Sequence, residues 1–115
     1  MKTDTVSVGE HDYTVAVQRS SDNKKAPILV YVNQVGNESL GCYIYSIASV
    51  RECYQSVLQG LENGDLHDFT ANLGRVLVKR YHCPLYVSLS GGISMYDYGE
   101  LSRAVVEKVD NGCYA

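Results

Sequence analysis

Two adjacent residues, His82 and Cys83, are the pair in this sequence whose types could most directly do chemistry. An imidazole can take the proton of a thiol, and the resulting thiolate is a strong nucleophile. The two groups must meet in space, with a ring nitrogen aimed at the sulfur, and adjacency along the chain does not provide that geometry. Cys83 also precedes Pro84 at the end of a helical pattern, which indicates a structural position. We therefore expect no catalytic residue.

Metal and phosphate sites are the other two chemistries that the residue types allow. The candidate zinc ligands lack the closely spaced pairs of a structural zinc site; they are Cys42, Cys53, His82 and Cys83. The segment Ser90-Gly91-Gly92 follows a strand pattern, but no lysine follows it, so we expect the glycines only to turn the chain out of the sheet. We expect no metal and no cofactor.

Carboxylates at the start of each helical pattern have spacings typical of helix caps rather than of an acid–base pair. These residues are Asp65, Asp68, Asp97 and Glu100. Together with the absence of a plausible nucleophile, this spacing favours a binding protein over an enzyme.

Composition limits the partners. The 115 residues fit one domain over residues 1–115, and the net charge of −3 argues against a nucleic-acid partner. Ten tyrosines with no tryptophan and one phenylalanine suit a surface that is exposed at some times and covered at others. No apolar run approaches membrane-spanning length, and we expect no membrane partner. The four cysteines are expected to be reduced thiols in a cytoplasmic protein, with the nucleus also open as a compartment.

Hydrophobic periodicity predicts strands first and helices later. The segment from Pro27 to Val50 contains two apolar runs around a polar turn at residues 36–39, which predicts a long β-hairpin. The other expected elements are a hairpin of residues 3–8 and 12–19, a short strand or irregular connector at 51–59, a helix from Asp65 to near His82, a strand at 85–90 and a helix from Asp97 to a stop at Gly112. This order predicts an α+β fold, with two helices on one face of an antiparallel sheet.

The central strands are apolar on both faces, so two sets of residues need cover. The narrow apolar stripes of two helices can cover one face. The aliphatic face matches these stripes better than the opposite face does; it carries Val15, Val17, Val30, Val32, Ile44, Val87 and Leu89. The opposite face would be aromatic and open to a partner. Its expected interface residues are Leu29, Tyr31, Tyr43, Tyr45, Ile47 and Tyr86. The alternative is that residues 51–59 or the N-terminal arm fold over this face.

The order and types of these segments resemble one family, the small proteasome-assembly chaperones of the third and fourth kind, and most closely the fourth. The segments that carry the resemblance span residues 12–110; they are ILVYVNQVG, LGCYIYSIASV, SVLQG, DLHDFTANLGRVLVKRYHCPLYVSLSG and LSRAVVEKV. The resemblance implies a non-enzymatic cytosolic factor that forms a heterodimer, sheet against sheet, with a companion assembly chaperone, its helices outward. It also implies that the heterodimer transiently holds a proteasome α subunit.

Two other hypotheses remain open from the sequence. A different small α+β interaction scaffold, profilin-like or roadblock-like, would also act by binding, but such folds usually carry a helix near the N-terminus. The second hypothesis is a small thiol enzyme that uses Cys83. Such an enzyme would have a reactive Cys83 thiol with a lowered pKa.

Overall fold

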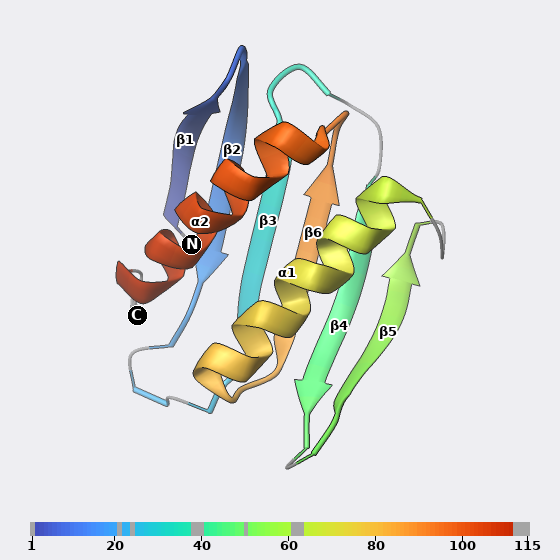
Figure 1. Ribbon diagram of the computed structural model, residues 1–115. Helices are drawn as coiled ribbons and strands as arrows, with labels where there is room; N and C mark the ends of the chain where they lie inside the picture. Colours follow the sequence, from blue (N-terminus) through green and yellow to red (C-terminus); the bar gives the residue numbers. More distant parts are fainter. Residues whose placement is uncertain are drawn as a thin grey trace.

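The structure is a computed structural model that describes residues 2–20, 22–23, 25–37, 41–49, 51–60 and 64–111. Its elements in chain order are β1 (Lys2–Val8), β2 (His11–Gln18), β3 (Ile28–Gln34), β4 (Cys42–Ala48), β5 (Cys53–Gln59), α1 (Asp65–Tyr81), β6 (Leu85–Ser90) and α2 (Met95–Asn111) (Figure 1). The expected turn at Glu38 and Ser39, the helix stop at Gly112 and the thiol of Cys113 lie outside these ranges.

The strands form one six-stranded sheet in the order β1-β2-β3-β6-β4-β5. The first hairpin is confirmed, since β1 pairs antiparallel with β2. The long hairpin predicted from Pro27 to Val50 is wrong, because β6 lies between β3 and β4 and pairs with both. The sheet is also not wholly antiparallel: β3 and β6 are parallel, with Val30 opposite Val87.

Helix α1 explains how β6 reaches that position. Residues 53–59, for which the sequence left a strand or a connector open, form the edge strand β5 beside β4. Because β4 is antiparallel to both β5 and β6, the last two run in the same direction, and joining such strands requires a crossover. Helix α1 makes that crossover and lies across β4 and β6 (Figure 1).

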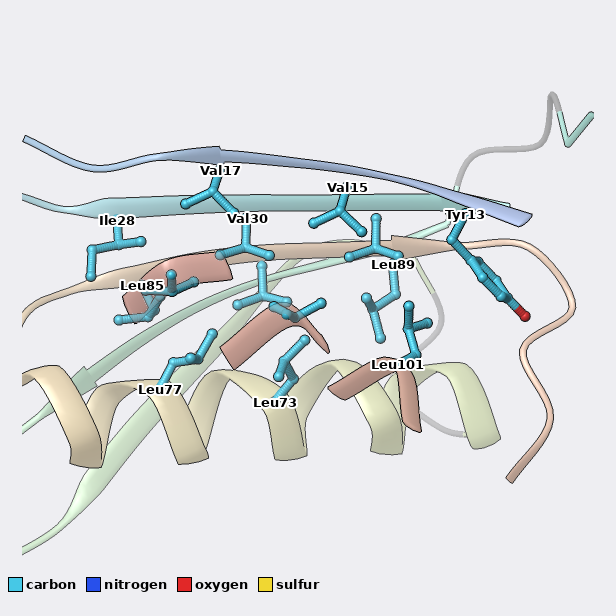
Figure 2. Close-up of a cluster of buried hydrophobic side chains, with 14 of the residues drawn as sticks. Tyr13, Val15, Val17, Ile28, Val30, Leu73, Leu77, Leu85, Leu89 and Leu101 are labelled. Atoms are coloured by element: carbon cyan, nitrogen blue, oxygen red, sulfur yellow. The ribbon is translucent and has the colours of Figure 1, made fainter. Parts of the chain in front are cut away.

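Both helices pack on one face of the sheet, as expected for this α+β fold (Figure 1). The core lies between the layers, where side chains from the strands meet Leu73 and Leu77 of α1 and Leu101 of α2 (Figure 2). All seven residues of the predicted aliphatic set are buried on this inner face. On α1, Val76 is 44% exposed, whereas Val78 is buried against the sheet.

The helix starts differ from the predicted caps. Gly64, not Asp65, precedes the first turn of α1, and no side chain caps it; Asp65 and Asp68 lie inside that turn, where the helix dipole favours acids. Helix α2 begins at Met95 rather than at Asp97, because the Ser94 hydroxyl accepts a hydrogen bond from the Asp97 amide (3.1 Å). The carboxylate of Asp97 instead accepts one from the hydroxyl of Tyr13 (3.2 Å), which ties α2 to β2.

Gly74 is the point where α1 comes closest to the sheet. A Cβ atom at this position would lie 2.6 Å from the hydroxyl oxygen of Ser46 on β4. Ser46 is fully buried and its hydroxyl accepts a hydrogen bond from the Gln55 amide (2.9 Å), which also donates to the carbonyl of Ala71 (2.8 Å). The glycine therefore permits close packing of the helix on the sheet, and the Gln55 side chain joins β5 to α1 at the same place.

We expect Gly74→Ala to lower the free energy of unfolding by about 1–3 kcal/mol, because the added methyl group overpacks a buried contact. Gly99→Ala in α2 is the matched control, since nothing lies within 4 Å of its added Cβ, and it should raise stability by up to about 1 kcal/mol. Urea unfolding measures both. Ser46→Ala combined with Gly74→Ala should recover part of the loss; a stabilising Gly74→Ala would contradict the packing account.

Candidate protein-binding face

The sheet face opposite the helices gathers the six predicted interface residues. We call Leu29, Tyr31, Tyr43, Tyr45, Ile47 and Tyr86 the tyrosine face. Strand pairing places Tyr86 between Leu29 and Tyr45 in one row across β3, β6 and β4. In the next row Ser88 lies between Tyr31 and Tyr43. Because alternate residues of a strand share a face, these rows lie on the side away from α1 and α2.

Four tyrosine rings of this face form a continuous chain of contacts. Tyr31 and Tyr43 lie 5.9 Å apart between ring centroids, Tyr43 and Tyr86 6.1 Å, and Tyr86 and Tyr45 4.8 Å. Strands β3 and β4 are two strand spacings apart, about 10 Å, so Tyr31 and Tyr43 must lean toward each other over the small Ser88. Their hydroxyls form a hydrogen bond of 3.3 Å. Burial and this hydrogen bond raise the pKa of Tyr43 to about 12.

Strand β5 also contributes to this face, which was not predicted from the sequence. Tyr54 lies opposite Ile47 and Ser56 lies opposite Tyr45, so both continue the tyrosine face to the edge of the sheet. Tyr54 is 56% exposed and Ile47 40%. The alternation of CYQSVLQ carried the signal, but without a recognised strand at 53–59 its outward residues could not be assigned.

The outer face carries no formal charge over its central rows. Apart from Tyr54, the register adds small or neutral polar side chains around the tyrosines, among them Gln18, Ser56 and Gln59. Charged residues make up 20% of the chain, yet none lies between the row of Thr14 and the row of Ile47. An aromatic centre, a neutral polar border and a lack of charge are the features that distinguish the core of a protein interface.

The segments that could have covered this face do not do so. Residues 2–8 form β1 and residues 53–59 form β5, so both extend the sheet at its edges instead of folding over it. The two helices pack on the inner face. In the part of the chain that the structure describes, no helix or strand lies over the tyrosine face, which leaves its rings only half-buried.

The structure places the candidate chemical groups in structural positions. Cys83 is buried in the core, and burial raises the pKa of its thiol, the reverse of what activates a nucleophile. His82 ends α1 in the left-handed conformation and is exposed. Cys42, Cys53 and Cys83 are free thiols; Cys42 and Cys83 are buried, and Cys53 is half-buried. Within the described ranges no three His, Cys, Asp or Glu residues gather as metal ligands.

The Ser90-Gly91-Gly92 segment turns the chain out of the sheet. Gly91 has a φ of 114°, and a Cβ there would lie 2.4 Å from the Cβ of Gln34. The amide of Gly92 donates to the side-chain oxygen of Gln34 (2.8 Å). The glycines thus have the steric role that the sequence suggested. Neither described helix is long and apolar enough to cross a lipid bilayer.

The layer arrangement puts the chain in the α+β class, and comparisons with known proteins narrow it further. A family model, 20S proteasome chaperone assembly proteins 3 and 4, matches residues 1–109, and the chain belongs to this family. The chain is therefore a protein of the 20S proteasome assembly chaperone class. No curated protein matches the sequence.

A solved structure has the same fold. It is described as the crystal structure of a novel chaperone complex for yeast 20S proteasome assembly, and one of its chains superposes with a TM-score of 0.67 at 20% sequence identity. The match covers 98% of each chain. The family model spans the third and fourth kinds together, so the closer likeness to the fourth stays a prediction.

We expect Tyr31→Phe to lower the pKa of Tyr43 from about 12 while leaving it above 10, because burial, the larger cause, remains. A raised pKa favours the neutral hydroxyl in the folded state. This contribution to stability is complete below pH 10 and is lost as the pH rises through 12. NMR titration of ring-labelled tyrosine measures the pKa. The 93% exposed Tyr96 supplies the control, Tyr96→Phe, which should change nothing. A pKa of Tyr43 near 10 would refute the contacts described among the four tyrosine rings.

Proposed function

We propose that the chain binds a companion assembly chaperone through its tyrosine face, sheet against sheet, and that the resulting heterodimer holds a proteasome α subunit during assembly of the 20S α-ring. The single observation that carries the proposal is a face with aromatic side chains and no charge in an otherwise charged protein. Water solvates such a face poorly, so covering it with another apolar surface is favourable.

The size of the sheet fits this role. The molecule measures 37 × 29 × 21 Å, and its broad side is large enough for the roughly 800 Å² that each partner buries in a standard interface. The structural neighbour is itself a chaperone complex, which supports a companion chaperone as the partner. The helices would then face outward, away from the companion.

The mechanism needs no bond to be made or broken. A chaperone that binds one arrangement of a subunit stabilises that arrangement by mass action, and it leaves when a later subunit competes for the surface. We place this activity in the cytoplasm, where free thiols such as Cys42 and Cys83 persist.

The rival scaffold of profilin-like or roadblock-like type fits less well. Such folds usually begin with a helix, whereas five strands precede Asp65 among the residues that the structure describes. The thiol-enzyme hypothesis loses its premise because Cys83 is a buried core residue with a raised pKa.

We expect Tyr45→Asp to leave the fold intact and to weaken binding of the companion chaperone at least about 100-fold, because the complex would bury an unpaired carboxylate. Tyr96→Asp makes the same change on the helix side and should bind normally. Size-exclusion chromatography of each variant mixed with the companion measures co-elution, and circular dichroism checks the fold.

Affinity purification of the tagged chain tests the second part of the proposal. The unmodified chain should recover the companion and proteasome α subunits, and Tyr45→Asp should lose both, since the heterodimer is the form that holds the α subunit. Co-elution of Tyr45→Asp with the companion would refute the proposed interface.

A further inference from the structure

Three of the basic side chains that the structure describes are engaged within the molecule. Arg80 pairs with Asp110 (2.7 Å) and Lys108 with Asp4 (3.1 Å). Arg19 donates to the carbonyl of Val109 (3.1 Å) and lies 4.5 Å over the ring of Tyr81. These cations fasten α2 to β1, to the residue that follows β2 and to α1, so they are engaged within the molecule.

Three other cations converge on a groove at the β5 edge of the sheet. Arg51, Arg75 and Lys79 line a space of about 640 Å³ together with the exposed His82. Among the described residues none forms a hydrogen bond or ion pair with these three cationic side chains. Glu52 is the single acidic residue of the lining, so the groove is positive although the chain carries a net charge of −3.

The groove is held by fixed parts of the fold. Arg75 and Lys79 lie one turn apart on α1, so their side chains leave the same side of the helix. Arg51 and Glu52 come from the connection after β4, where the amide of Ser49 donates to the carbonyl of Glu52 (2.7 Å) and the Glu52 amide donates to the Ser49 hydroxyl (3.2 Å). The residues that carry the cations therefore have defined backbone positions relative to β5.

Among the strands that the structure describes, the one beside the groove has an unpaired edge. β5 is the last strand of the sheet, and its sequence CYQSVLQ contains no charge and no proline. Edge strands usually carry such residues to prevent further pairing, as β1 does with Asp4 at the other edge. The start of β5, at Cys53 and Tyr54, lines the groove itself. An unprotected edge next to uncompensated cations suits an extended, acidic chain.

We propose that this groove binds an acidic, extended segment of a partner protein. Its main chain adds to the free edge of β5, and its carboxylates, alternating along the strand, meet Arg51, Arg75 and Lys79. A nucleic acid is a poorer occupant, because strong phosphate binding takes about 6–10 contacts and this groove offers three cations beside Glu52. The inference goes beyond the proposed function and does not rest on the tyrosine face.

The test uses the full chain and a fluorescein-labelled peptide of four Glu-Thr repeats, in which every carboxylate lies on one side of an extended strand. Fluorescence anisotropy should show binding at least tenfold tighter than that of the matched Gln-Thr peptide. Arg75→Gln with Lys79→Gln should weaken it about tenfold or more, because charge-assisted hydrogen bonds are lost. Arg103→Gln on α2, outside the groove, and Tyr45→Asp on the tyrosine face should leave it unchanged.

Several results would overturn the inference. Equal binding of the two peptides would remove the role of charge, and an equal loss in Arg103→Gln would remove the role of the groove. An oligothymidine that binds more tightly than the peptide would make nucleic acid the occupant. Two further peptides test strand addition, one N-methylated at the Glu amides and the other at the Thr amides. Only alternate amides of an added strand face β5, so only one of these two peptides should lose binding. An equal effect of both methylations would exclude strand addition.

Discussion

The insertion of β6 between β3 and β4 is the constraint on which the rest of this structure depends. It requires helix α1 to cross β4, and the absence of a side chain at Gly74 lets the helix lie close enough to do so. The same insertion brings residues of three strands into two rows on the outer face. Without β6 the rings of Tyr43 and Tyr45 would have no Tyr86 to contact. One topological step therefore builds both the core and the tyrosine face.

The two sides of the sheet are apolar for different reasons. The inner side is aliphatic and is sealed by helices, with Ser46 satisfied by Gln55 rather than exposed to water. The outer side is aromatic, and its hydroxyls give half-buried rings such as Tyr31 and Tyr43 a hydrogen-bond partner in the free chain. Tyrosine thereby keeps the free face tolerable in water while leaving a large apolar area for a partner.

Much of this could be predicted from the sequence, and the failures have physical causes. Local periodicity located most of the strands and both helices, and alternation assigned the six residues of the tyrosine face to one side. Strand order could not be obtained in this way, because a strand that is apolar on both faces fits a hairpin and a central position equally well. The edge strand at 53–59 was uncertain because little of it is buried. The start of α1 at Asp65 was predicted correctly, but the predicted start of α2 was two residues late, because Ser94 caps this helix while Asp97 binds Tyr13.

The central claim is that a companion protein covers the tyrosine face. Hydroxyl-radical footprinting with mass spectrometry measures this residue by residue, on the chain alone and with the companion chaperone added. We predict that oxidation of Tyr45 and Tyr86 falls sharply in the complex, while the 93% exposed Tyr96 on the helix side reacts equally in both. Unchanged oxidation of Tyr45 and Tyr86 in a formed complex would contradict the account.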